Sequence, residues 1–185
     1  RNEIVAAADV TRLDPEGALV YPGLWRGRSA EDVASVCAQG TTFALRIDMT
    51  RAIEFAHHKT GGVPLAFTEF DEAGTERKVM ADPARWGDVL VIRKEIPASY
   101  FLAVVVDDAR QGITHVTRGM DLYSATDAQR LLQVLLDLPE PLYHHHRLIL
   151  DGTGRKLSKS RGDTSIASLR SEGASPADVR RYLGL

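Results

Sequence analysis

The segment Lys156-Leu157-Ser158-Lys159-Ser160 is the most informative stretch of this 185-residue chain. It follows a turn that reads DGTG at residues 151–154, and its two lysines stand three residues apart with hydroxyl side chains beside them. Glycines allow such a loop to close over a bound triphosphate, and each ammonium group can then neutralise the charge that develops on leaving pyrophosphate. On spacing alone, a mobile basic surface loop is the alternative interpretation.

Two stretches upstream of this loop contain further motifs. Residues 100–108 read YFLAVVVDD, and residues 112–122 read GITHVTRGMDL. The sequence RKLSKS at 155–160 is similar to the KMSKS signature of class I aminoacyl-tRNA synthetases, and the two upstream stretches resemble segments of the glutamyl-type enzymes. The three motifs lie in the family's order over roughly residues 98–170. The resemblance therefore implies the second half of a glutamyl-type catalytic domain.

Within this family the chain most resembles the glutamyl-Q tRNA(Asp) synthetases, short members that attach glutamate to queuosine in the anticodon loop of tRNA(Asp). The resemblance implies a cytoplasmic ligase that activates glutamate with ATP, accompanied by Mg²⁺, and passes the glutamyl group from the adenylate to tRNA. Two other functions stay open. One is an ordinary glutamyl-tRNA synthetase fragment that charges tRNA(Glu), and the other is a non-catalytic tRNA-binding relic of the fold.

The resemblance also implies roles for single residues. Tyr100 matches a tyrosine that hydrogen-bonds the bound glutamate, and Arg118 matches an arginine that binds glutamate through a cation suited to bidentate pairing. Lys159 matches the ATP-contacting lysine, assisted by Lys156, so these two are the catalytic candidates. His145 matches a histidine near the nucleotide. The structural alternatives are that Tyr100 fills the core, that Arg118 forms a partly exposed surface ion pair, and that His145 is simply packed or solvated.

The sequence gives little support for a bound metal. On a strand, the histidines at 144–146 would alternate between faces, so neighbouring rings could not share an ion. Zinc-bearing members of the family use a Cys-x-Cys pair and a later Tyr-x-x-x-Cys. Here Tyr21 is followed four residues on by Trp25, and an indole nitrogen can only donate a hydrogen bond. We therefore regard structural zinc as doubtful.

Composition sets broad limits. An apolar fraction of 44% and a charged fraction of 26% are typical of a soluble globular protein, and the single cysteine, Cys37, excludes an internal disulfide. No apolar run approaches the roughly 20 residues that span a bilayer. Residues 144–185 carry eight Lys/Arg against four Asp/Glu, although the whole chain has a net charge of −2. This asymmetry favours an anionic ligand near that end, with a solvated charged surface as the alternative.

Periodicity and capping signals predict an α/β chain. We expect strands at 43–47, 67–70, 89–93, 113–117 and 148–150, and a loop at 54–64. We expect helices at 29–40, from a capping box at Thr126, at 166–172 and from Ser175-Pro176. Residues 100–106 favour a strand by propensity, but their length does not separate a strand from a helix.

The predicted fold class is α/β, with two parts. Residues 1–95 are expected to be part of an inserted α+β acceptor-binding subdomain, which the resemblance places around Tyr21-Pro22-Gly23 and Arg26. Residues 96–185 are expected to be the C-terminal half of a Rossmann-like catalytic domain. The family's first signature, a His-x-Gly-His motif, does not occur here. We therefore expect this chain alone to be inactive, and the short helices after Lys159 predict that the intact protein lacks an anticodon-binding domain.

Overall fold

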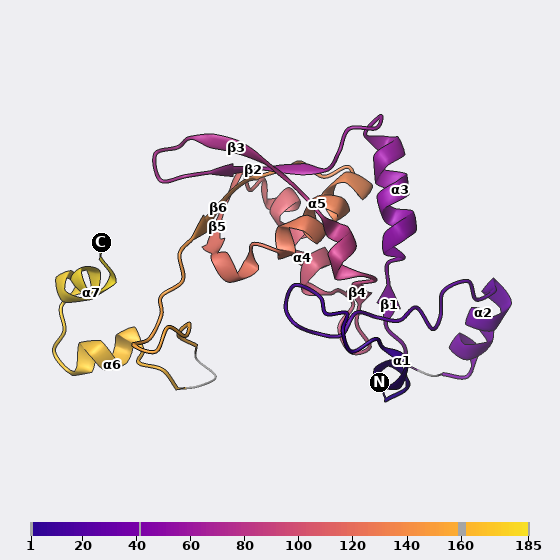
Figure 1. The fold of residues 1–185 in the computed structure, drawn as a ribbon, viewed down its shortest axis with the longest axis horizontal. Coiled ribbons are helices and arrows are strands. Elements are labelled where there is room, and N and C mark those ends of the chain that lie inside the picture. The colour runs from indigo at the N-terminus through magenta and orange to yellow at the C-terminus, as the bar shows by residue number, and fades with distance from the viewer. Residues whose placement is uncertain (1, 41, 159–161, 185) are drawn as a thin grey trace. The chain divides into compact units, whose positions relative to one another are not determined.

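A computed structural model describes residues 2–40, 42–158 and 162–184 (Figure 1). These residues divide into two compact units, each of which is considered separately below. The first unit comprises the described residues up to 118 together with 122–145, and the second comprises 119–121 and the described residues from 146 onward. None of the helices in the described ranges is long and apolar enough to cross a membrane.

A four-stranded sheet organises the first unit, with the strand order β3-β2-β6-β5. Its strands are β2 (Ala66–Phe70), β3 (Glu76–Met80), β5 (His115–Gly119) and β6 (Leu142–His146). Strand β2 runs antiparallel to β3 and parallel to β6, with Glu69 opposite Tyr143. A separate antiparallel pair joins β1 (Leu45–Arg46) to β4 (Leu90–Ile92). The parallel β2–β6 pair, joined by helices, confirms the α/β fold class.

The core of the first unit lies where three helices meet. These are α3 (Met49–Lys59), α4 (Tyr100–Gln111) and α5 (Ala125–Leu135), with the 3₁₀ turn η1 (Pro83–Trp86) beside them. One cluster of buried apolar side chains joins α3, η1 and α5 with Val89, and it contains Met49, Ala52, Ala56, Trp86, Val89, Ala125, Ala128 and Leu131. By contrast, α1 (Asn2–Ala7) and α2 (Ala30–Ala38) bury none of their residues. These two N-terminal helices therefore contribute no buried residue to the core.

Residues 100–106 form the start of a helix, α4, although their propensity favours a strand. The Ser99 hydroxyl caps the helix by accepting a hydrogen bond from the Leu102 N–H at 3.4 Å. Gly112 ends it in the left-handed conformation, with a φ of 66°. Phe101 packs edge-on against Trp86, with ring centroids 5.0 Å apart. Caps at both ends and packing of one face outweigh the strand preference of the valine run.

The expectation of a loop at residues 54–64 was wrong, because α3 continues through Lys59. The Asp48 side chain caps this helix by accepting from the Arg51 N–H at 3.2 Å. Met49, Ala52 and Ala56 are spaced three and four residues apart, which places them on one face, and all three are buried. That spacing was readable in the sequence, but the polar residues at 57–59 obscured it.

The expected capping box at Thr126 was also wrong. Helix α5 begins at Ala125, so its N-cap is Ser124, two residues before Thr126, and Ser124 makes no side-chain capping bond. Thr126 and Gln129 lie within the helix and are both fully buried. The Thr126 hydroxyl is hydrogen-bonded to Arg118 of β5 and His145 of β6. This side chain therefore makes tertiary contacts in place of the capping hydrogen bond predicted from the local sequence.

The second unit contains two short helices that match their sequence signals. Helix α6 (Ile166–Ser171) is capped by Ser165, and α7 (Pro176–Leu183) begins with a capping box between Ser175 and Asp178. The strand expected at 148–150 is reduced to a single bridge between Leu150 and Lys156. The turn between these two residues is held by Asp151, whose carboxylate accepts from the backbone N–H groups of Thr153 and Arg155.

Asp88 ties distant segments of the first unit together, and it predicts a large mutational effect. Its buried carboxylate accepts hydrogen bonds from Arg26 at 2.5 and 2.7 Å and from the Met49 N–H at 2.9 Å. Asp88→Asn keeps the shape but turns one acceptor into a donor that faces other donors. We expect it to lower the free energy of unfolding by about 2 kcal/mol, measured by urea denaturation.

The matched control for this prediction is Asp137→Asn. Asp137 also forms an ion pair, with Lys59, but its side chain is 80% exposed. Exposed pairs contribute little, and asparagine tolerates the positive φ of this position, so the stability should barely change. Equal losses in the two variants would show that Asp88 has no special role.

Candidate functional site

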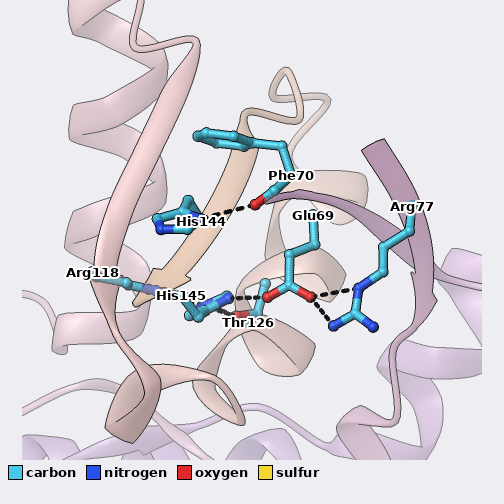
Figure 2. Close-up of polar contacts among 7 residues, drawn as sticks. All are labelled: Glu69, Phe70, Arg77, Arg118, Thr126, His144 and His145. Atoms are coloured by element: carbon cyan, nitrogen blue, oxygen red, sulfur yellow. Dashed lines mark hydrogen bonds and ion pairs between the residues drawn. The ribbon is translucent and has the colours of Figure 1, made fainter. Parts of the chain in front are cut away.

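The candidate site is a chain of polar side chains on adjacent strands of the sheet, shown in Figure 2. His145 of β6 is at its centre, with a fully buried side chain. Its neighbour His144 lies on the opposite face, where its Nδ1 is 2.9 Å from the Phe70 carbonyl oxygen. The alternation expected of adjacent strand residues therefore holds, and the consecutive histidines do not converge on one point.

One side of the His145 ring contacts Glu69 of β2. The His145 Nδ1 atom lies 2.9 Å from the Glu69 Oε1 atom. The other carboxylate oxygen, Oε2, accepts from Arg77 of β3 at 2.5 and 3.0 Å. Glu69 is buried, whereas the Arg77 side chain is 70% exposed. Arg77 therefore brings a positive charge from the surface to a carboxylate that would otherwise be buried with only a histidine.

The other side of the ring contacts Arg118 of β5. The Arg118 Nε atom lies 3.2 Å from the His145 Nε2 atom, and Arg118 Nη2 donates to the Thr126 hydroxyl at 2.6 Å. The guanidinium carbon also lies 5.1 Å from the centre of the Tyr143 ring, a cation–π arrangement. Three elements, β5, β6 and α5, thus fix the arginine.

These contacts determine the protonation of His145. An arginine N–H can only donate, so Nε2 of the histidine must accept and carries no proton. The ring proton then lies on Nδ1 and is donated to the Glu69 carboxylate. A neutral imidazole with this tautomer satisfies every contact, whereas an imidazolium would set an N–H against the N–H of Arg118.

The pKa shifts agree with this assignment. Burial lowers the pKa of His145; the hydrogen bond to Glu69 opposes this effect and the charge of Arg118 adds to it, leaving the pKa below its ordinary value. For Glu69, burial raises the pKa, but the hydrogen bonds from Arg77 and His145 and the charge of Arg77 lower it, and the net shift is downward. At neutral pH the pair is therefore a carboxylate and a neutral ring.

Arg118 is suited to bind an anion. Among the residues that the structure describes, its hydrogen-bond partners are neutral, and none of the carboxylates forms an ion pair with it. Burial raises the pKa of Asp108, and the charge of Arg118 only partly opposes that effect. A half-buried guanidinium without a paired carboxylate gains from a carboxylate or phosphate ligand, which it can hold through two parallel hydrogen bonds.

Tyr100, the other candidate for glutamate binding, begins α4. It is 45% exposed, and its ring lies at a tilt beside that of Phe101. No hydrogen bond joins it to Arg118 in the described part of the chain. Its role in binding glutamate stays a prediction.

Of the two lysine candidates, the structure describes Lys156, which belongs to the second unit. Lys156 Nζ lies 2.5 Å from Asp121 Oδ2, and the hydrogen bond from Lys156 lowers the pKa of Asp121. Gly119 makes room for this aspartate, because an added Cβ would lie only 2.5 Å from Asp121 Oδ1. Lys159 lies outside the described residues. His145 belongs to the first unit, and both of its ring nitrogens are engaged by protein groups, so neither is available to a nucleotide in this arrangement.

Sequence reasoning missed Glu69, Arg77 and Thr126. A signal for Glu69 was present, because Phe67 and Glu69 share a face of one strand and Phe67 is an obvious core residue. A carboxylate on a buried face requires a partner, which predicts a polar contact there. The identity of that partner depends on the pairing of β2 with β6, which lie more than 70 residues apart in the chain.

The position at which the family's zinc ligand would stand lies at the N-terminal end of the first unit. Trp25 stands where a cysteine ligand would be needed, and Arg28 lies over its ring at 5.2 Å. The Tyr21 hydroxyl accepts from the Trp25 N–H at 3.0 Å. Within the described residues, no group of three His, Cys, Asp or Glu side chains could hold a metal ion. The residues present here do not fit a zinc site.

Comparison with known proteins supports the resemblance seen in the motifs. Residues 66–185 match the family of class I tRNA synthetases (E and Q), catalytic domain. A glutamyl-Q tRNA(Asp) synthetase from Rhodobacter capsulatus is 41% identical over 189 residues, which cover the whole of this chain and 64% of that protein. One from Symbiobacterium thermophilum is 35% identical, over 99% of this chain and 52% of that protein. The chain thus spans about half to two-thirds of these relatives.

Solved structures support the fold. The crystal structure of a glutamate tRNA ligase from Elizabethkingia meningosepticum, in complex with its amino acid, superposes with a TM-score of 0.58 at 22% identity. The match covers 94% of this chain and 35% of that one. The fold class and the family predicted from the sequence are both confirmed.

The buried histidine predicts a specific pH dependence of stability. The unfolded chain binds a proton at His145 below about pH 6.5. The folded protein resists that proton because the folded pKa is lower, so the free energy of unfolding should fall as the pH decreases from about 6.5 towards the folded pKa. His145→Gln should make this slope shallower between about pH 7.5 and 5.5, a window that lies above the titration of Glu69. Denaturant titrations across this range measure the slope.

His146→Gln is the matched control, because His146 is adjacent in sequence but exposed. Its slope should equal that of the unmodified protein. If His145→Gln also left the slope unchanged, the His145 pKa in the folded state would not be depressed.

Proposed function

The chain belongs to the class I tRNA synthetase family for glutamate and glutamine, and we propose that the intact protein activates glutamate with ATP and transfers it to the queuosine of tRNA(Asp). The observation that carries the proposal is Arg118, a half-buried guanidinium with neutral protein partners in a sheet of this family. The sequence similarity to glutamyl-Q tRNA(Asp) synthetases over the whole chain supports the choice of tRNA. The reaction would take place in the cytoplasm.

In this proposal a glutamate carboxylate oxygen attacks the α-phosphorus of ATP. The new P–O bond gives glutamyl-adenylate, and the bond to the β-phosphate breaks to release pyrophosphate. A queuosine hydroxyl then attacks the acyl carbon, and AMP leaves. The protein would contribute by orienting glutamate and stabilising charge, with little covalent chemistry of its own.

In this proposal Arg118 and Tyr100 bind glutamate, and the two lysines bind ATP. Arg118 binds glutamate through a carboxylate, and the hydroxyl of Tyr100, a residue that is 45% exposed, adds a hydrogen bond. Lys156 and Lys159 neutralise the phosphates of ATP, which Mg²⁺ accompanies. For Lys156 this requires exchanging the Asp121 carboxylate for phosphate oxygens, an exchange that its 46% exposure permits. Residues 1–95 would be the acceptor-binding subdomain, and residues 96–185 the second half of the catalytic domain.

Arg118 gives the sharpest test of the amino-acid site. Arg118→Ala in the intact protein should weaken glutamate binding by about 2–4 kcal/mol, because a charge-assisted pair is lost. Arg118→Lys should not restore the affinity, since an ammonium group lacks the bidentate fork. Isothermal titration with glutamate measures both. Arg110→Ala, which removes an exposed arginine from α4, is the control and should leave the affinity unchanged.

The tRNA substrate is tested by charging assays. The intact protein should transfer labelled glutamate to tRNA(Asp) that contains queuosine, and not to tRNA(Asp) that lacks it. Charging of tRNA(Glu) instead would identify an ordinary glutamyl-tRNA synthetase. Glutamate-dependent ATP–pyrophosphate exchange should be present in either case, and its absence from the intact protein would indicate a non-catalytic relic.

A further inference from the structure

The pair Glu69–His145 is costly and is not explained by the packing of the sheet. Placing a carboxylate in the interior requires compensating contacts, and an apolar pair of similar size would suit the site without them. Both groups instead make fully matched hydrogen bonds in a row, from Arg77 through Glu69 and His145 to Arg118 (Figure 2). The last group in the row is the Arg118 guanidinium, to which we assign the binding of glutamate.

The direction of these hydrogen bonds matters for Arg118. Its Nε–H needs an acceptor, and His145 Nε2 is an acceptor only while the proton stays on Nδ1. Glu69 holds the proton there because its carboxylate can only accept. Arg77 in turn keeps Glu69 ionised through two hydrogen bonds. The orientation of Arg118 thus depends on a carboxylate two strands away.

We propose that Glu69 and His145 are positioning residues, which hold the Arg118 guanidinium in the orientation that receives the carboxylate of glutamate. The proposal rests on the function proposed above. It gives His145 an indirect role in amino-acid affinity, in place of the nucleotide contact implied by the family resemblance. Glu69 has no role in that resemblance.

The surroundings of His145 support this reading. Charged or titratable groups surround the ring on several elements. They are Glu69 of β2, Arg77 of β3 behind Glu69, Arg118 of β5, Tyr123 before α5, and Tyr143 and His144 of β6. In the described residues, Glu69 is the one carboxylate in contact with the ring. Protonation of the ring would place a second cation beside Arg118 and replace the acceptor at Nε2 with a donor.

An acid-side loss of glutamate affinity follows from this arrangement. In the intact protein the KM for glutamate in ATP–pyrophosphate exchange should rise as the pH is lowered from about 7.5 to 5, while the KM for ATP stays nearly constant. His145→Gln should abolish that rise, because its carboxamide oxygen can accept from Arg118 and does not titrate. His145→Leu should raise the glutamate KM roughly tenfold or more at neutral pH, since the acceptor is gone.

The second partner is tested in the same assay. Glu69→Ala removes the group that fixes the tautomer and should raise the glutamate KM in the same direction as His145→Leu. His144→Leu is the matched control, because His144 is adjacent but contacts Phe70 on the other face of the sheet. It should leave both KM values unchanged. Should the Leu variant not fold, the pH profile of His145→Gln decides the question.

Two results would overturn the proposal. A rise in the KM for ATP with an unchanged glutamate KM in His145→Leu would make the residue a nucleotide contact. A pH profile of His145→Gln identical to that of the unmodified protein would show that the ring does not control Arg118. Arg118→Ala separates the two levels of inference. If it abolishes glutamate affinity while the His145 and Glu69 variants do not, only the positioning role fails. If it has no effect, the assignment of the glutamate site fails as well.

Discussion

The hydrogen bond between Glu69 and His145 joins β2 to β6, two parallel neighbours far apart in the sequence. Two parallel strands can be joined only by a long crossover connection. Here that connection contains η1, α4 and α5, which form the core together with α3. Every residue of the candidate site in the first unit reaches its position through that crossover or at its ends. The Glu69 carboxylate and its partners therefore depend on the correct packing of the helices. The helices in turn depend on a cluster of apolar side chains that includes Ala125, the residue before Thr126.

Burial and hydrogen bonding together determine the charges in the site. Burial makes the imidazole neutral, and neutrality makes it an acceptor for an arginine. The same burial makes a lone carboxylate unfavourable, and Arg77 compensates from the solvent side. A cation at each end, with an anion and a neutral ring between them, leaves one net positive charge. That charge resides where Arg118 lacks an ionic partner among the described residues.

The sequence predicted the parts of the structure that obey local rules. Hydroxyl side chains before helical periods predicted caps at Ser29, at Thr164 or Ser165, and at Ser175, and the structure has them at Ser29, Ser165 and Ser175. The fold class and the family followed from three motifs in order. The valine-rich start of α4 and the polar end of α3 were harder, because their helical state depends on burial against other elements. The contacts of Arg118 were beyond local reasoning, since they require knowing which strands are neighbours.

The start of α5 shows how such a site limits engineering of the protein. Ser124 stands at the N-cap without a capping hydrogen bond, while two residues later the Thr126 hydroxyl serves Arg118 and His145. The helix is thus weaker at its first turn than its composition allows. Substitutions that replaced the Thr126 hydroxyl and gave the helix a capping side chain at its N-cap would make the helix more stable. They would also remove the oxygen that accepts a hydrogen bond from Arg118. Thermostabilised variants selected only for folding are expected to drift toward that exchange, so selection at this turn has to preserve the contacts of Arg118.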